Sequence, residues 1–530
     1  MSANESETVR ITLVPLGKTL SVKRGEPLQQ QLFAHGVEFP CGGRGRCRRC
    51  RVRVLKGHLS VTPTDAQRLS QADIDAGWRL ACQARAETDL TLELAQWEAS
   101  ILGDDMRFEF TPKEGLGVAI DLGTTTIVAQ LLDLQTGNVL GVRSALNSQA
   151  QYGSDIMSRV EYAISPGGLD ILTQTVRQQT GRLVTDLLRE LEARATGSES
   201  TPASEALRTV IIVGNTVMHH LFCGISVEPL SHHPFEPCND GLQRFSASDL
   251  GWDVPGRAEV MFLPCLGGFI GSDILAGILA TGIHTSDRLV ALVDLGTNGE
   301  IVMGNRTQLL CASTAAGPAF EGARISMGML AATGAISAVK NDGGRFQCTV
   351  LGDGRPRGIC GSGLVDAIAV ALDLGLIDHT GRLKSGDSLV LEGQVTINQK
   401  DIRELQLAKG AIAAGIRLLL ERWNAQSEDL DCLWLAGAFG NYISRASAKR
   451  IGLIPFPTEK VKPAGNTALR GAKHVLLGAV ENDPEHTMIR QRVLHVPLNE
   501  EPRFHEVFVS EMQFPAPDCH MPQRGAATAE

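Results

Sequence analysis

Long apolar runs and aromatic side chains are both scarce in this chain of 530 residues, in which aromatic residues make up 5%. No stretch of 18 consecutive apolar residues occurs, so we expect no membrane-spanning helix. The first ten residues contain Glu5 and Glu7 and no apolar segment, which is not the pattern of a secretory signal peptide. We therefore expect a cytoplasmic protein whose cysteines stay reduced.

An excess of one charge is also absent, because 50 Lys and Arg residues accompany 59 Asp and Glu residues, for a net charge of −9. This balance gives no sign of nucleic-acid binding across the whole surface. The apolar fraction of 43% excludes a disordered chain, and the length predicts two to four domains. The 56 glycines favour tight turns and close approach of the backbone to a ligand.

Cysteine is unevenly distributed, since four of the 12 cysteines lie in the first 82 residues with the spacing C-x5-C-x2-C-x31-C. They are Cys41, Cys47, Cys50 and Cys82. Three thiolates on one glycine-rich loop and a distant fourth can hold two bridged irons. A zinc site is the first alternative, although zinc ribbons use paired C-x-x-C knuckles and one such pair is present. Unligated thiols are the second alternative.

This constellation resembles a [2Fe–2S] ferredoxin domain. Alternating apolar residues over 9–13, 52–54 and 90–94, with a helix expected over 27–34, predict a small β-grasp fold for it. Six arginines surround the cysteine loop: Arg44, Arg46, Arg48, Arg49, Arg51 and Arg53. They form either a solvated edge, a docking face for an acidic redox partner or, less favoured, a local nucleic-acid contact.

From residue 117 onward, apolar strands end in glycine-rich turns and alternate with amphipathic helices, which predicts an α/β architecture. The segment 118–125 (VAIDLGTT) recurs as 291–298 (ALVDLGTN), 173 residues later, which indicates a duplicated domain. After a strand, such a hairpin can place backbone N–H groups and Thr hydroxyls on phosphate oxygens. Asp121 and Asp294 would repel a phosphate, so they are better placed to hold Mg²⁺ through water than to contact the phosphate directly.

A third element follows the same logic, because an apolar strand over 433–436 runs into the small residues of 437–441 (GAFGN). Small residues at a helix start let a nucleotide lie against the backbone. The three elements, in this order, resemble the phosphate-1, phosphate-2 and adenosine motifs of the actin, heat-shock chaperone and sugar-kinase (ASKHA) superfamily. The resemblance implies a two-lobed, ribonuclease-H-like fold that binds ATP. Glu300 either orients an attacking water or is an ordinary charge at a helix N-terminus.

A ferredoxin domain fused to an ASKHA domain resembles the reductive activators of corrinoid proteins. Further stretches carry this resemblance: 147–149 (NSQ), 152–155 (YGSD), 214–220 (GNTVMHH), 315–322 (AAGPAFEG), 358–363 (GICGSG) and 406–409 (QLAK). The resemblance implies ATP-dependent transfer of an electron from the cluster to an inactive Co(II) corrinoid, which regenerates Co(I). It also implies an upstream electron donor, a corrinoid protein of a methyltransferase system as partner, no nucleic acid, no membrane and a homodimer.

By the same resemblance we assign three groups of residues. The catalytic group is Asp121, Asp294 and Glu300. The nucleotide-binding group is Gly123, Thr124, Thr125, Thr126, Gly296, Thr297, Asn298, Gly299, Gly317, Gly361, Gly437, Ala438 and Gly440. Glu321 and Lys409 are further cleft candidates, and the four cysteines ligate the metal.

The predicted organisation is a ferredoxin domain over 1–96, a linker over 97–115, an ASKHA domain over 116–514 with halves near 116–285 and 286–514, and a disordered tail over 515–530. We also expect a flexible loop over 196–206. Three other functions stay open: electron donation to a different low-potential metalloprotein, a small-molecule kinase, and a chaperone-like binding module without electron transfer.

Overall fold

The computed structural model describes residues 8–14, 18–33, 50–94, 110–194, 203–254, 258–296, 298–322, 324–331, 334–351, 355–478 and 484–516. Cys41, Cys47, the four arginines between 44 and 49 and Thr297 lie outside these residues, as do most of the linker, the loop 195–202 and the tail from 517. Within the described residues, no helix combines the length and apolarity needed to cross a membrane.

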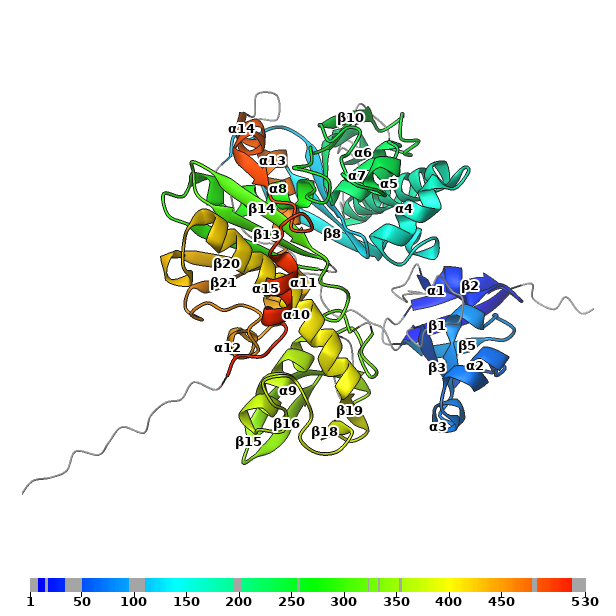
Figure 1. Ribbon diagram of the computed structural model, residues 1–530. Coiled ribbons are helices and arrows are strands. Elements are labelled where there is room, and N and C mark those ends of the chain that lie inside the picture. The colour runs from blue at the N-terminus through cyan, green and yellow to red at the C-terminus, as the bar shows by residue number, and fades with distance from the viewer. Residues whose placement is uncertain are drawn as a thin grey trace, which may run out of the picture.

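The N-terminal unit is a five-stranded sheet in the order β2-β1-β5-β3-β4. Strands β1 and β5, the first and last in sequence, lie side by side and parallel. Strand β2 pairs antiparallel with β1, and β3 pairs antiparallel with both β5 and β4. This topology confirms the predicted β-grasp fold. Its elements are β1 (Thr8–Val14), β2 (Lys18–Lys23), α1 (Leu28–Phe33), β3 (Arg51–Lys56), α2 (Pro63–Arg68), α3 (Gln71–Asp75), β4 (Trp78–Leu80), η1 (Ala81–Gln83) and β5 (Leu90–Leu94). Figure 1 shows this unit in blue, on one flank of the larger remainder.

Two six-stranded sheets form the lobes of the remainder, and five strands of each follow one order. In the first lobe the order is β8-β7-β6-β9-β11, and in the second it is β14-β13-β12-β20-β21. In both, the first three strands form an antiparallel meander and the next two run parallel to the first strand. The shared topology confirms the two-lobed, ribonuclease-H-like fold that the repeated segment predicts.

The first lobe contains β6 (Leu116–Leu122), β7 (Thr126–Asp133), β8 (Val139–Leu146), η2 (Ser148–Gln151), α4 (Ile156–Ile164), α5 (Gly168–Arg194), α6 (Ala203–Ala206), β9 (Leu207–Val213), α7 (Thr216–Cys223), η3 (Glu228–Leu230), β10 (Gln243–Ser246), β11 (Glu259–Phe262), α8 (Ser272–Thr281) and η4 (Ile283–Thr285). The expectation of a flexible loop up to 206 is wrong at its end, because residues 203–206 form the one-turn helix α6.

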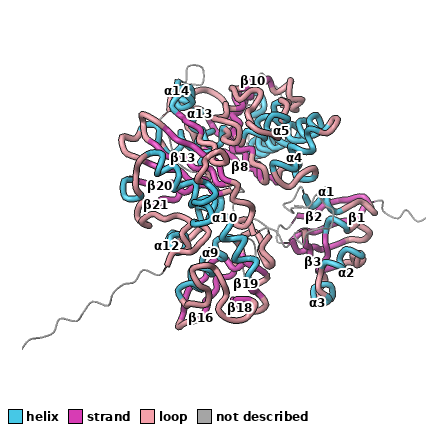
Figure 2. The backbone as a smooth tube through the Cα atoms, in the orientation of Figure 1, coloured by secondary structure: helices cyan, strands magenta, loops and turns pink. Residues whose placement is uncertain are grey.

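The second lobe contains β12 (Val290–Leu295), β13 (Gly299–Gly304), β14 (Leu309–Thr314), η5 (Ser427–Asp429), β20 (Cys432–Ala436), α11 (Gly437–Tyr442), α12 (Arg445–Arg450), β21 (Val461–Gly465), α13 (Thr467–Leu477), α14 (Pro484–Arg492), β22 (Val493–His495) and α15 (Phe504–Glu511). Inserted in it is a smaller subdomain of β15 (Ala335–Asp342), β16 (Arg345–Val350), β17 (Gly358–Ile359), α9 (Gly361–Asp373), β18 (Ser388–Glu392) and β19 (Val395–Asn398). The long helix α10 (Gln399–Trp423) runs from this subdomain to the second sheet (Figures 1 and 2).

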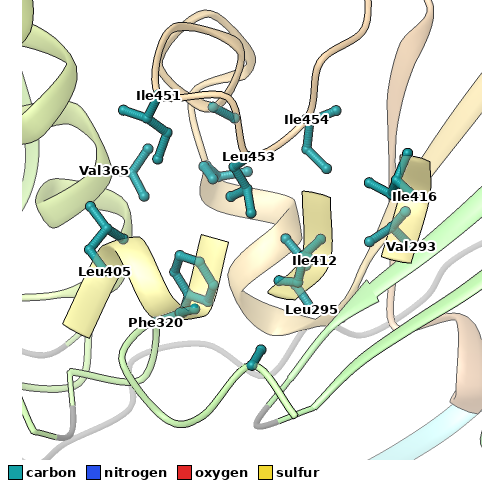
Figure 3. Packing of buried hydrophobic residues seen from close by; sticks show 14 of the residues in the cluster. Val293, Leu295, Phe320, Val365, Leu405, Ile412, Ile416, Ile451, Leu453 and Ile454 are labelled. Carbon is teal, nitrogen blue, oxygen red and sulfur yellow. The ribbon is translucent and has the colours of Figure 1, made fainter. Parts of the chain in front are cut away.

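One hydrophobic core continues from the second sheet into the inserted subdomain. Figure 3 shows Val293 and Leu295 of β12 near Ile412 and Ile416 of α10, with Val365 of α9 in the same cluster. A separate cluster joins the two lobes, because it contains residues of both sheets together with α8 and α13. The two lobes are therefore connected through a shared pair of helices.

Helices α8 and α13 approach so closely that a side chain on Gly471 of α13 has no room. A Cβ atom there would lie 2.0 Å from the carbonyl oxygen of Ala276 and 2.4 Å from its Cα. Both contacts are with the backbone of α8, so neither can be relieved by rotating a side chain.

We predict that Gly471→Ala destabilises the protein by about 1–3 kcal/mol, because the added methyl group forces two packed helices apart. In an ordinary helix the same change stabilises by about 1 kcal/mol, so the sign is diagnostic. The measurement is the urea midpoint of the wild type and the variant. Gly267→Ala is the control, since its new Cβ would meet no atom closer than 3.5 Å. A stabilised Gly471→Ala protein would contradict the close crossing.

Candidate functional site

Cys50 and Cys82 lie together at one end of the ferredoxin sheet. Cys50 directly precedes β3, and Cys82 lies in η1 directly after β4, the antiparallel partner of β3. The N–H of Ala81 donates to the carbonyl oxygen of Cys50 at 2.9 Å, and both cysteines are buried. Two buried thiols on adjacent segments provide the soft ligands that an iron–sulfur cluster requires.

Asp65 holds the segment that leads to Cys82. Its carboxylate accepts a hydrogen bond from the N–H of Leu80 at 2.8 Å, and its other oxygen accepts from the N–H of Thr62 at 2.8 Å. Nothing in the sequence spacing points to Asp65, which lies 17 residues before Cys82. It is the kind of outer-shell support that fixes ligand-bearing backbone.

We predict that Cys82→Ala removes the electron paramagnetic resonance signal of the one-electron-reduced cluster, because it removes one of the thiolate ligands. Reduced full-length protein is measured after iron and sulfide loading. Cys238→Ala is the matched control, since Cys238 is exposed and distant in sequence from the cysteine loop. A signal unchanged in Cys82→Ala would show that this residue is not a ligand.

The two repeated hairpins bring Asp121 and Asp294 close enough to interact electrostatically, and we call this junction of the lobes the cleft. Asp121 is the second-last residue of β6, and Asp294 is the second-last residue of β12. Asn466, which caps α13 of the second lobe, donates its amide to the Asp121 carboxylate at 2.8 Å. The first and second lobes therefore meet at Asp121.

Two further acids lie near this pair, so that Asp121, Asp273, Asp294 and Glu300 interact electrostatically. Burial raises the pKa of Asp121 to about 6, against the hydrogen bond from Asn466. Burial, with the charge of Asp121 added, raises the pKa of Asp294 to about 7. Burial thus favours the neutral form of each carboxyl group in the cleft.

Asp273 is the acid that the sequence analysis missed. It lies in the first turn of α8, and its backbone N–H donates to the carbonyl oxygen of Gly214 at 3.3 Å. Burial, then the charges of Asp294 and Asp121, raise its pKa to about 7. In sequence it reads as an ordinary acid at a helix start, which is common and carries no specific signal.

Glu300 lies on β13, paired with Asp294 across the strand, so the alternative of a helix N-terminal charge is wrong. Burial raises its pKa well above the usual value, with the charges of Asp273 and Asp294 added. A buried carboxyl group with a raised pKa is a candidate general acid or base.

The hairpin at 123–126 is held in place by Asn147 and Asn215 of the family-like stretches and by Arg159. Asn147 donates its amide to the carbonyl oxygen of Gly123 at 2.9 Å, and Asn215 donates to the hydroxyl of Thr124 at 2.9 Å. The guanidinium of Arg159, fully buried, donates to the carbonyl oxygen of Thr124 at 2.6 Å. These bonds order the backbone of Gly123, Thr124, Thr125 and Thr126.

The remaining candidates surround the second hairpin and the start of α9. The N–H of Gly296 donates to the carbonyl oxygen of Asn298 at 3.0 Å, and Gly299 begins β13. Gly437 has a φ of +85°, and a Cβ there would lie 2.6 Å from the Asp294 carboxylate. Ala438 and Gly440 follow it in α11.

Gly361 opens α9 against two other candidate segments. A Cβ at Gly361 would lie 1.9 Å from the carbonyl oxygen of Phe320 and 3.0 Å from the ring of Phe439. The rings of Phe320 and Phe439 stack with centroids 4.6 Å apart. Gly317 differs, because its φ is +75° and a Cβ added there would meet no atom within 4 Å. Gly317 is therefore open rather than packed.

The prediction that Lys409 lies in the cleft is wrong. Its ammonium group donates to the carbonyl oxygens of Gln513 at 2.8 Å and Gly452 at 3.4 Å. It is buried and anchors the C-terminal segment, together with Gln406, which donates to the carbonyl oxygen of Met512 at 2.9 Å. The family-like stretch 406–409 therefore serves packing of the C-terminus.

An iron–sulfur unit joined to a two-lobed ASKHA unit defines the class of protein. The model of the 2Fe-2S iron-sulfur cluster binding domain matches residues 11–87, that of the RACo middle region matches 116–286, and that of the C-terminal ASKHA domain of RACo matches 288–524. The chain belongs to the RACo family, the reductive activators of corrinoid proteins.

Three similar proteins support this assignment. The corrinoid activation enzyme RamQ of Eubacterium limosum is 35% identical over 428 residues, which are 75% of this chain and 70% of RamQ. The [Co(II) methylated amine-specific corrinoid protein] reductase of Methanosarcina barkeri is 28% identical over 400 residues, 68% of this chain and 70% of that one. The solved structure of a reductive activator for corrinoid, iron-sulfur protein superposes with a TM-score of 0.67 at 27% identity, covering 97% of this chain and 99% of that one.

We predict that the carboxylate cluster makes stability fall as pH rises from about 4 to about 7. The folded pKa values of about 6 to 7 lie above the ordinary 3.8, so the folded state binds more protons between these values. The stabilisation is complete below about pH 4 and is lost as pH rises through about 7.

Asp273→Asn removes one charge of the cluster, so its melting temperature should fall less than that of the wild type between about pH 5 and about pH 7.5. Thermal unfolding of both proteins across this range is the measurement. Asp387→Asn is the control, because Asp387 is exposed. Parallel curves for Asp273→Asn and the wild type would contradict the charge coupling.

Proposed function

We propose that this protein is an ATP-dependent reductive activator of a corrinoid protein. Its reduced [2Fe–2S] cluster loses one electron, and the Co(II) corrinoid of a methyltransferase-system protein gains it and becomes Co(I). An upstream donor then returns one electron to the oxidised cluster. The observation that carries the proposal is one chain holding both the Cys50–Cys82 pair and the carboxylate-lined cleft, as its RACo relatives imply.

ATP is the proposed ligand of the cleft. The hairpins at 123–126 and 296–299 would place backbone N–H groups near its phosphates, and the threonine hydroxyls of the first hairpin would add donors. Asp121 and Asp294 would hold Mg²⁺, because a cation favours the charged form that burial disfavours in both carboxyl groups. The backbone at Gly317, Gly361, Gly437, Ala438 and Gly440 is the proposed wall for the nucleoside.

Glu300 is the proposed base that orients the attacking water. It is buried beside two other acids, which raise its pKa, and a bound cation would lower it again by neutralising those charges. Loss of Glu300 should therefore slow hydrolysis more than it weakens nucleotide binding.

The need for ATP follows from reduction potentials. Plant-type [2Fe–2S] centres lie near about −400 mV. Co(I) formation needs a lower potential, and each 59 mV of a one-electron gap changes the equilibrium tenfold. ATP can contribute only through conformations that bind the partner differently. The lobes supply such a hinge, because they share α8 and α13 and meet at the Asn466–Asp121 hydrogen bond.

Assembly and boundaries belong to the same proposal. We take residues 1–96 as the electron-transfer domain and 116–514 as the ATPase domain, with halves that divide near 286. A homodimer and a cytoplasmic location are the arrangement that the family resemblance suggests.

The test separates the two chemistries. Titrating Co(II) corrinoid protein with reductant should raise Co(I) absorbance only when Mg²⁺ and ATP are present. Cys50→Ala should abolish Co(I) formation and spare ATP hydrolysis, because the cluster loses a ligand while the cleft is intact. Asp294→Ala should lower ATP hydrolysis at least tenfold and spare the cluster spectrum.

Two outcomes would overturn the proposal. One is ATP-independent Co(I) formation, and the other is ATP hydrolysis without any Co(I) above the level of the Cys50→Ala protein. Circular dichroism of each variant shows that a lost activity is not a lost fold.

A further inference from the structure

The iron–sulfur unit and the ATPase unit meet at Arg357. The guanidinium of Arg357 forms an ion pair with the carboxylate of Glu93 on β5, and it lies 5.2 Å from the ring centroid of Trp78 on β4. The side chains of Arg357 and Glu93 are 26% and 18% exposed. Such an ion pair is screened less by salt than a pair on the open surface.

The ferredoxin side of this contact is built into the strands that lead to the cluster ligands. The second carboxylate oxygen of Glu93, Oε2, forms an ion pair with Nη1 of Arg53 at 3.8 Å. The guanidinium of Arg51, the residue after Cys50, lies 5.8 Å from the centroid of Trp78. Trp78 begins β4, which ends two residues before Cys82. The contact surface therefore lies on β4, which leads to Cys82, and on β5, which pairs with the strand that follows Cys50.

The ATPase side is equally specific. The N–H of Arg357 donates to the carbonyl oxygen of Gly334 at 2.8 Å, which holds the segment against β15. Gly334 has a φ of +88°, and a Cβ there would lie 2.9 Å from Cγ of Arg357. The absence of a side chain at Gly334 makes room for the stem of Arg357.

Arg357 also connects directly to the nucleotide cleft. It precedes β17, and only three residues separate it from Gly361, which opens α9 between Phe320 and Phe439. The N–H of Cys360 donates to the carbonyl oxygen of Ile336 at 3.1 Å, so this short segment is held on both sides. Arg357 and Gly361 therefore belong to one short segment whose backbone is held by hydrogen bonds near both ends.

We propose that Arg357 docks the iron–sulfur unit onto the ATPase unit and ties its position to the segment that enters the nucleotide cleft. The cluster is then presented differently when nucleotide occupies the cleft. The nucleotide dependence of this docking rests on the proposed function. The surface around Arg357 is occupied by residues 78–93 of the same chain.

Small-angle X-ray scattering of the full-length protein, without corrinoid protein, tests the docking. Arg357→Ala should increase the radius of gyration by roughly 2 Å or more, because the released unit samples extended positions. Glu93→Ala should have the same effect, and the double variant should add little to either. Arg355→Ala is the matched control, since Arg355 is an exposed arginine two residues away.

A second arm tests the link to the nucleotide. A non-hydrolysable ATP analogue with Mg²⁺ should change the scattering of the wild type and leave that of Arg357→Ala unchanged. The paired exchange Glu93→Arg with Arg357→Glu should restore the compact form, which separates loss of docking from loss of folding.

Three results would overturn the inference: wild-type scattering from Arg357→Ala, an equal effect of Arg355→Ala, or an analogue response that persists in Arg357→Ala. None of these depends on Co(I) formation. A failed reductase assay with intact docking would overturn the proposed function, whereas unchanged scattering with an active reductase would overturn the docking alone.

Discussion

Burial of carboxylates from both lobes in one place is the constraint on which the cleft depends. Asp121 and Asp273 come from the first lobe, and Asp294 and Glu300 from the second. Burial raises the pKa of each. Holding the four groups together in their charged form therefore costs free energy in the apo protein. The proposed divalent cation and phosphate would reduce that cost, and their binding would then be coupled to the spacing of the lobes.

The lobes can respond to this equilibrium because their connection is narrow and tightly packed. Helices α8 and α13 are in backbone contact at Gly471, and α13 also carries Asn466 to Asp121. Asp273 lies in the first turn of α8, and Asn466 caps the start of α13. Both helices of the crossing therefore begin at the carboxylates. A change in charge at the cleft therefore acts on the same two helices that hold the lobes together.

Much of this arrangement was accessible from the sequence, since its signals are local. A cysteine loop, a strand followed by DLGT and an apolar strand followed by GAFG each depend on neighbouring residues, so spacing alone predicts the ferredoxin unit, the duplicated lobes and the placement of Asp121 and Asp294 at strand ends. The order of the strands in both sheets confirms the fold that these motifs imply. Local hydrogen bonding and strand periodicity leave such motifs few alternative structures.

Only the tertiary structure decided the roles of residues whose partners are remote in sequence. Asp273 looks like a common helix-start acid until packing brings it beside Asp294, and Lys409 looks like a cleft residue until its ammonium group meets the carbonyl oxygen of Gln513. Arg357 has no motif at all, yet it meets Glu93 across 264 residues of sequence. The sequence by itself determined which turns and strands form, because those depend on adjacent residues. Tertiary packing determined which charges share a cavity or an interface, because electrostatic energy depends on distance in space and on burial.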